Sequence, residues 1–407
     1  MAVPHAADCI GCGVARHPDA HRSASYTIAF GGGGASVAKY LRLWGDGIEV
    51  TLIERHRRYT SNILSSLVLT GQRTIESLGF GYDALQSRHG VRVLFDEVAE
   101  LDPAGVAVTL RGGRRLGADR IVVAPGIEFD AVPGLATPER MPHAWQAGPQ
   151  TTLLAQQLAA MPEGGVAVLA IPKAPYRCPP GPYERACLLA DWLRVRKPRA
   201  KLIVLDANPD IVIEKENFRR AFDGLHAKVI EYRPGVELVS ADSVTMTLTT
   251  SAGPVRGDVV NLIPAQRAPA LVERAGLAGA GGRFAPVDVL SYASTVAPKV
   301  HVIGDACATT QPKAGHIANQ EGKVCADAIV RLLAGNEPDP APVTASACYS
   351  TITRSEAGWL GTVFQYDAAS RQMKAVPESA APSPGWSAKN FKQMGRWFDA
   401  LMADTFA

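Results

Sequence analysis

The sequence has no run of 18 apolar residues, so it predicts no membrane-spanning helix. Its excess of positive charge is small, with 42 basic against 39 acidic residues, which excludes a protein that binds nucleic acid through a basic surface. Seven cysteines in 407 residues are too few for a disulfide scaffold, although they suffice for one redox pair. A hydrophobic content of 47% with 20% charged residues excludes global disorder. We therefore expect a globular enzyme.

The length of 407 residues exceeds what one compact core usually holds and predicts two or three domains. Residues 1–24 show no hydrophobic segment of the kind found in secretory signals, and we expect a disordered leader there. Cys9 and Cys12 form a C-x-x-C pair within it. Haem attachment would require a histidine in place of Gly13, and a zinc site with His17 and His21 would have a spacing far shorter than the usual finger. This pair is therefore not expected to carry the function.

A glycine-rich turn follows the first apolar strand of the chain. Residues 26–30 are typical of a buried strand, residues 35–43 of a helix and residues 48–53 of a second strand, which ends at Glu54. This order predicts a Rossmann unit, in which glycines admit a pyrophosphate at the helix N-terminus and the acid binds a ribose. Two registers of the glycine fingerprint are possible, and each lacks one glycine: Gly31, Gly33 and Ser36, or Ala29, Gly31 and Gly34.

Two later strands end in residues that suit the same nucleotide. Residues 120–123 form an apolar run that stops at Ala124-Pro125-Gly126, which resembles the second dinucleotide motif of two-domain flavoproteins. Residues 299–303 form another strand-like run, which is followed by Gly304-Asp305 and then by a helix-like stretch. In such flavoproteins the aspartate accepts a hydrogen bond from a ribityl hydroxyl of the flavin. We therefore expect one FAD site to draw on all three regions.

A second strand–helix–strand unit spans residues 164–205, and its connection over residues 172–182 is rich in proline. Proline lacks the backbone N–H that would bind a pyrophosphate, so NADH binding is disfavoured here. The loop instead holds Cys178 in a rigid turn. The expected division of the chain is an FAD-binding domain in two parts (25–150 and 266–335), a second Rossmann-like domain (151–265) and a C-terminal flavin-covering and interface domain (336–407).

The loop around Cys178 resembles a known active-site loop. Arg177-Cys-Pro-Pro-Gly-Pro-Tyr-Glu-Arg185 is similar to the loop in the flavoprotein subunit of flavocytochrome c sulfide dehydrogenase, within the FAD-dependent pyridine nucleotide-disulfide oxidoreductase superfamily. Further similar segments follow in order and extend the resemblance over residues 26–407: 38–40, 48–54, 123–128, 142–145, 261–267, 302–307, 312–315, 348–350 and 404–406.

The resemblance implies an α/β fold with two Rossmann-like domains, arranged as in glutathione reductase, and a C-terminal α+β domain. It implies an enzyme that oxidises sulfide at FAD and passes the electrons to a c-type cytochrome subunit in the periplasm. Cys178 and Cys348 match the family's redox disulfide, which hydrosulfide would attack by thiol–disulfide exchange. A thiolate at Cys178 would also gain from the N-terminus of the helix that follows.

Glu184 is the expected proton acceptor by resemblance, although a glutamate in the first turn of a helix also commonly stabilises the helix end. Lys313 is a candidate for stabilising reduced, anionic flavin. The residues expected to bind the cofactor are Gly31, Gly33, Gly34, Glu54, Asn62, Ala124, Gly126, Gly304, Asp305 and Lys313.

The chain departs from the family in three respects. The family links FAD covalently through a cysteine, whereas residues 59–67 contain none and Asn62 stands at about that place. The glycine fingerprint is incomplete, and no export signal is legible. We therefore expect non-covalent FAD. The other cysteines of the folded part, Cys187, Cys307 and Cys325, are expected to be packing residues.

Two other functions remain open from the sequence. Sulfide:quinone oxidoreductases lie on membranes through C-terminal amphipathic helices, and residues 388–406 form one apolar stripe at helical spacing. Packing of this stripe against the chain itself or a partner is the commoner fate, so membrane contact is not expected. The incomplete fingerprint and the missing flavin-linking cysteine would also suit a degenerate, non-catalytic FAD-binding protein, but the presence of both Cys178 and Cys348 argues against it.

Overall fold

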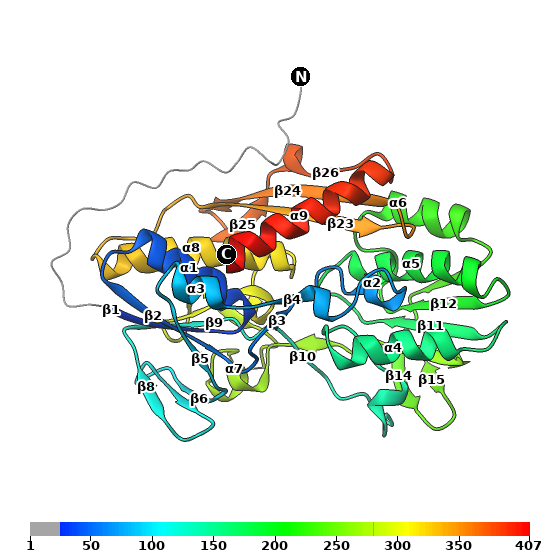
Figure 1. Ribbon diagram of the computed structural model, residues 1–407, viewed down its shortest axis with the longest axis horizontal. Helices are drawn as coiled ribbons and strands as arrows, with labels where there is room; N and C mark the ends of the chain where they lie inside the picture. Colours follow the sequence, from blue (N-terminus) through cyan, green and yellow to red (C-terminus); the bar gives the residue numbers. More distant parts are fainter. Residues whose placement is uncertain (1–24, 280) are drawn as a thin grey trace.

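The computed structural model describes residues 25–279 and 281–407, which form two Rossmann-like units and a C-terminal layer that contacts both (Figure 1). The leader with Cys9 and Cys12 lies outside the described residues. The α/β fold class expected from the sequence is confirmed by this architecture.

The first unit is built on a sheet with the strand order β22-β19-β20-β21-β9-β1-β2-β5. Strands β21, β9, β1, β2 and β5 run parallel, so their carboxyl ends meet along one edge. Helices α1 and α8 pack against each other beside this sheet (Figure 1). The bounds are β1 Ser25–Phe30, α1 Gly32–Trp44, β2 Ile48–Glu54, α3 Asp83–Ser87, β5 Arg92–Phe95, β9 Arg120–Val123, β19 Ala285–Asp288, β20 Ala293–Ser294, β21 Val300–Val302, β22 Cys307–Ala308 and α8 Gly315–Leu333.

The second unit is a parallel sheet with the strand order β13-β12-β11-β17. Helix α5 follows the proline-rich loop and packs on β11 and β12. The bounds are α4 Pro149–Ala160, β11 Val166–Ile171, α5 Gly181–Arg196, β12 Lys201–Asp206, α6 Lys215–Arg220, β13 Ile230–Pro234 and β17 Val259–Leu262, with a small antiparallel sheet of β14 Leu238–Asp242, β15 Thr247–Thr250 and β16 Gly253–Arg256.

The C-terminal layer is an antiparallel sheet followed by helix α9 (Ala388–Phe406). Strand β23 contacts α5 of the second unit and α8 of the first, so this layer bridges the two. The hydroxyl of Ser387 accepts the N–H of Asn390 and starts α9. Its sheet consists of β23 Val343–Thr351, β24 Ala357–Asp367, β25 Gln372–Ala375 and β26 Ala381–Pro382.

The apolar stripe of α9 is covered by the chain itself. Its buried side chains are Met394, Phe398, Leu401, Met402 and Phe406, and the ring of Phe406 stacks on that of Phe80, with the centroids 5.8 Å apart. Within residues 25–279 and 281–407, no helix is both long and apolar enough to cross a membrane.

Short elements connect these layers. Strands β3 (Tyr59–Thr60) and β4 (Gly79–Phe80) pair with each other, as do β10 (Glu128–Phe129) and β18 (Gln266–Arg267). The rest are α2 Ser66–Leu69, β6 Val98–Asp102, β7 Ala107–Leu110, β8 Arg115–Gly117, α7 Ala270–Arg274 and the one-turn or π-type helices Glu76–Leu78, Pro138–Arg140, Ala221–Leu225, Gly304–Ala306 and Pro377–Ser379.

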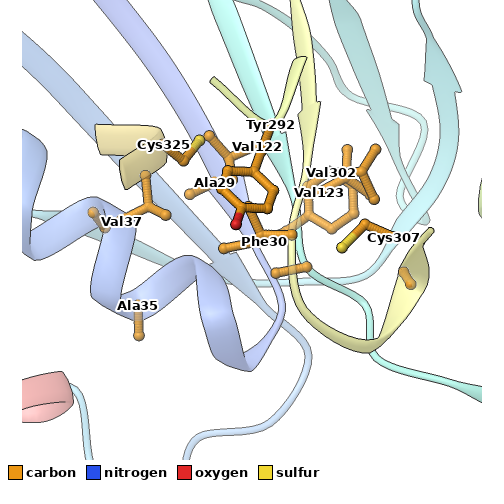
Figure 2. Close-up of a cluster of buried hydrophobic side chains, with 14 of the residues drawn as sticks. Ala29, Phe30, Ala35, Val37, Val122, Val123, Tyr292, Val302, Cys307 and Cys325 are labelled. Carbon is orange, nitrogen blue, oxygen red and sulfur yellow. The ribbon is translucent and has the colours of Figure 1, made fainter. Parts of the chain in front are cut away.

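Three cysteines belong to the cores, as expected. Figure 2 shows Cys307 and Cys325 among the buried side chains of the first unit, around Tyr292 and the central strands. Cys187 is equally buried in the core of the second unit. Burial raises the pKa of each of these thiols, so they remain protonated, small and apolar.

Candidate active site

A cavity of about 880 Å³ lies where the first unit, the proline-rich loop and strand β23 meet. Its volume is in the range of ligand and cofactor sites. Most of the residues expected from the sequence line it: Gly31, Gly33, Glu54, Asn62, Ala124, Gly126, Cys178, Glu184, Gly304, Asp305 and Cys348. Gly34 and Lys313 are not part of this lining.

The glycine turn after β1 contains Gly31, which both registers of the fingerprint share. Gly31 has φ +83°, and a Cβ there would lie 2.0 Å from the carbonyl oxygen of Ala124, so no larger residue fits. Gly33 and Ser36 both face the cavity. The last glycine of the fingerprint normally permits close packing of the helix on the sheet, and this role distinguishes Gly34 from Ser36.

Ser36 packs against a glycine on the facing helix. A Cβ on Gly322 of α8 would lie 3.3 Å from the Cβ of Ser36, so the close approach of α1 and α8 depends on Gly322. Gly34 instead faces Ala29 and Leu52 and lets α1 pack closely on its own sheet, so the geometry favours the register Ala29, Gly31 and Gly34.

Two carboxylates stand at the ends of the parallel strands. Glu54 ends β2, and Asp305 follows β21 in the turn Gly304–Ala306. Burial raises the pKa of both, and the charges of Arg177 and Lys313 oppose that shift at Asp305. The glycine turn, the two strand-end carboxylates and the size of the cavity fit FAD, which needs a close approach to its pyrophosphate and acceptors for its hydroxyls.

Cys178 sits in a tightly held turn between β11 and α5. Its φ is +57°, its N–H donates to the carbonyl of Lys313 at 2.7 Å, and its own carbonyl accepts the N–H of Gly181 at 2.8 Å. A Cβ on Gly181 would lie 2.9 Å from the sulfur of Cys178. The loop thus fixes the direction of the thiol toward the cavity, which it lines.

Cys348 approaches the same cavity from strand β23. Both cysteines are free thiols in the structure. Burial raises the pKa of Cys348 to about 12, and burial and then the charge of Cys348 raise the pKa of Cys178. The expected gain of a Cys178 thiolate at the N-terminus of α5 is therefore outweighed by desolvation in this state.

Glu184 lies in the first turn of α5 but does not cap that helix. Its Oε1 instead accepts from the hydroxyl of Thr351 at 2.8 Å and from the N–H of Thr351 at 3.3 Å. Burial raises its pKa to about 7, and these hydrogen bonds limit the shift. A carboxyl group that titrates near neutral pH beside two thiols has the properties of a proton acceptor.

A second buried carboxyl group, Glu214, was not anticipated from the sequence. It precedes α6 with φ +50°, and its Oε1 accepts from the hydroxyl of Ser350 at 2.9 Å. Burial, together with the charge of Glu184, raises its pKa to about 7. The strand that carries Cys348 therefore holds two carboxylates through consecutive residues, Ser350 and Thr351.

The geometry does not favour the role considered for Lys313. Its ammonium donates to the carbonyls of Asp305 at 2.9 Å and Cys307 at 2.7 Å, and it lies 3.7 Å from the centroid of the Phe284 ring. Lys313 thus holds the Asp305 turn from behind rather than facing the cavity.

Asn62 does line the cavity, and its Oδ1 accepts the N–H of Ala147 at 2.7 Å. Arg185, also overlooked, is buried and donates to the carbonyl of Ala144 and the side chain of Asn261. It lies 4.6 Å from the centroid of the Trp145 ring and ties α5 to the segment before α4.

Two Rossmann-like units around a cavity with a glycine turn, strand-end carboxylates and two thiols define an FAD-dependent oxidoreductase of the disulfide-oxidoreductase class. Residues 151–264 match the family described as sulfide dehydrogenase (flavocytochrome c) flavoprotein chain, central. Residues 340–406 match the family described as flavocytochrome c sulphide dehydrogenase, flavin-binding. These two matches confirm the resemblance over the second Rossmann-like unit and the C-terminal layer, and the flavin-binding match supports FAD as the cofactor.

Solved structures share the fold at low sequence identity. The sulfide:quinone oxidoreductase of Aquifex aeolicus has a TM-score of 0.77 at 17% identity, covering 94% of this chain and 91% of that one. Putidaredoxin reductase, solved in a covalent complex with putidaredoxin, has a TM-score of 0.64 at 15% identity, covering 94% of each chain. The NAD-dependent persulfide reductase of A. fulgidus has a TM-score of 0.62 at 15% identity, covering 92% of this chain and 77% of that one.

Proposed function

We propose that this chain oxidises sulfide through Cys178 and Cys348 and passes the electrons through FAD to a c-type cytochrome. The observation that carries the proposal is that both thiols and Glu184 line the same cavity as the glycine turn and Asp305. A sulfur pair and a proton acceptor are thus within reach of the place where the residues fit a flavin.

The chemistry starts from the oxidised cysteine pair. Hydrosulfide attacks one sulfur, so that one S–S bond forms to the substrate while the bond between the cysteines breaks, and the other cysteine leaves as a thiolate. Re-forming the bond between the cysteines releases zero-valent sulfur, one proton and two electrons. Bound FAD supplies the two-electron acceptor. The carboxylate of Glu184 takes the proton, as its near-neutral pKa allows.

The electron acceptor and the location follow from the family. Its name describes the flavoprotein chain of a flavocytochrome c, which supports a c-type cytochrome as partner and, with the known setting of that complex, the periplasm. The apolar stripe of α9 is packed against the chain itself, so it offers no support for a membrane-surface quinone reductase.

Anaerobic titration with sulfide tests the proposal. Sulfide should bleach the visible band of the flavin, and reoxidation should reduce a c-type cytochrome rather than a quinone in liposomes. Cys178→Ser and Cys348→Ser should each keep FAD but lose the bleaching. Cys325→Ala, which removes a buried thiol that is not part of the lining, is the matched control and should retain it. Full activity in either serine variant would refute the mechanism.

A further inference from the structure

Arg177 carries a buried donor that the protein itself leaves without an acceptor. Its side chain is 10% exposed and lines the cavity, yet its Nη2 has no hydrogen-bond partner among the described residues. Its Nη1 lies 3.9 Å from Oδ2 of Asp305, which is beyond hydrogen-bond length. A buried cationic donor without an acceptor is costly and calls for a ligand that the protein alone does not supply.

The backbone of Arg177 is held by side chains on either side of it. The N–H of Arg177 donates to the Oε1 of Gln266 at 2.8 Å, and its carbonyl accepts from the indole N–H of Trp145 at 3.2 Å. These bonds anchor the backbone from which the guanidinium extends into the cavity.

The other buried cations near the cavity already have partners. The ammonium of Lys313 is bonded to two backbone carbonyls. The guanidinium of Arg185 is bonded to backbone carbonyls and to Asn261. Among these buried cations, Arg177 is the one with a donor left for a ligand.

We propose that Arg177 binds FAD, with Nη2 donating to an oxygen of the ribityl–diphosphate chain beside Asp305. A planar guanidinium suits an anionic or hydroxyl oxygen, and Asp305 alongside balances the charge. The inference rests on FAD being the cofactor of this cavity.

The test is the affinity of the FAD-depleted full-length protein for added FAD, measured by quenching of flavin fluorescence. Arg177→Met should weaken binding roughly 10- to 100-fold, the range for one hydrogen bond to a charged group. The FAD affinity of Arg177→Lys should fall between those of the wild type and Arg177→Met, because lysine keeps the charge but loses the planar pair of guanidinium donors. Arg274→Met is the control: Arg274 also lines the cavity but is exposed and reaches the carbonyl of Ala99, so it should change little.

Thermal unfolding with and without FAD separates binding from a purely structural role. Loss of a ligand contact reduces the stabilisation that FAD adds, whereas a structural role lowers both transitions equally. Unchanged FAD affinity in both Arg177 variants, or an equal loss in Arg274→Met, would overturn the inference. If the wild-type protein bound no FAD at all, the cofactor assignment itself would fail, which is a distinguishable result. Should Arg177→Met not fold, Arg177→Lys decides.

Discussion

Replacing Glu184 with glutamine should slow sulfide oxidation and, at alkaline pH, stabilise the protein. Glutamine keeps the shape of the side chain and can still accept from the hydroxyl and the N–H of Thr351, but it cannot take up a proton. In the wild-type protein the pKa of Glu184 is raised from 4.5 to about 7 because the carboxylate is buried. The same burial makes it a base near neutral pH and a cost to folding when charged.

The magnitude of the stability effect follows from the shift. A carboxyl group with a raised pKa in the folded state binds its proton more tightly there, so its favourable contribution is complete below pH 4.5 and is lost as pH rises to about 7. The shift corresponds to about 3 kcal/mol. Glutamine carries no charge at any pH, so the variant should match the wild type near pH 4 and exceed its stability at pH 8.

The substitution that stabilises the protein at alkaline pH should lower the rate of flavin bleaching by sulfide. Only the carboxylate accepts a proton, so the limiting rate of flavin bleaching at saturating sulfide should rise in the wild type through a pKa of about 7. The variant should be about 100-fold slower or more, without this rise. Because hydrogen sulfide also ionises near neutral pH, the limiting rate must be used rather than the ratio of rate to sulfide concentration. Glu216→Gln, an exposed acid on α6, is the control.

Stopped-flow bleaching and guanidinium midpoints at several pH values check both effects on the same preparations. Identical pH profiles in the variant and the wild type, for rate and midpoint alike, would refute the reasoning and leave Glu184 as a structural ligand of Thr351.

Two further predictions concern nucleotide binding. NADH should not bleach the flavin anaerobically, because the acid that would hold its ribose is already occupied. That acid is Asp206, at the end of β12, which is fully buried and accepts from the hydroxyls of Tyr183 and Tyr232 at 2.8 Å each. Rapid bleaching by NADH would contradict this prediction. Gly31→Ala should abolish FAD retention, measured as the flavin-to-protein absorbance ratio, because the new Cβ would lie 2.0 Å from the carbonyl oxygen of Ala124. The control Gly112→Ala, whose Cβ would lie in open space, should retain FAD. An unchanged ratio in Gly31→Ala would show that FAD binding does not require glycine at this position.

Local patterns predicted most of the fold. The first strand, the glycine turn and Glu54 are contiguous, so their order alone indicated a nucleotide site at the carboxyl ends of parallel strands. The choice between the two glycine registers was not accessible in this way. It depends on the contacts of Gly34 with Ala29 and Leu52, which form only when α1 packs on the sheet.

The site was less predictable where contacts are distant in sequence. Only the family resemblance joined Cys178 to Cys348. Glu214 gave no signal, because its relation to Cys348 arises only in the fold, where the hydroxyl of Ser350 donates to it. Lys313 was placed near the flavin from its position before a helix. Sequence could not show that its ammonium points to the carbonyls behind the Asp305 turn.

The last prediction concerns how FAD is held. A covalent link to the 8α-methyl of the flavin needs a cysteine sulfur, and the residue at the corresponding place, Asn62, has none. Its Oδ1 is bonded to the N–H of Ala147. Among the described cysteines, only Cys178 and Cys348 line the cavity, and the proposed chemistry requires both.

Acid precipitation should therefore release all the FAD into the supernatant and leave a colourless pellet. The variant lacking both Cys178 and Cys348 should behave in the same way, since neither holds the cofactor. A yellow pellet, or a tryptic peptide that carries the flavin mass, would show a covalent bond. Repeating the precipitation with Cys9→Ser and Cys12→Ser would then tell whether a sulfur outside the described residues had formed it. Without such a bond, retention of FAD rests on the glycine turn, the two strand-end carboxylates and the guanidinium of Arg177.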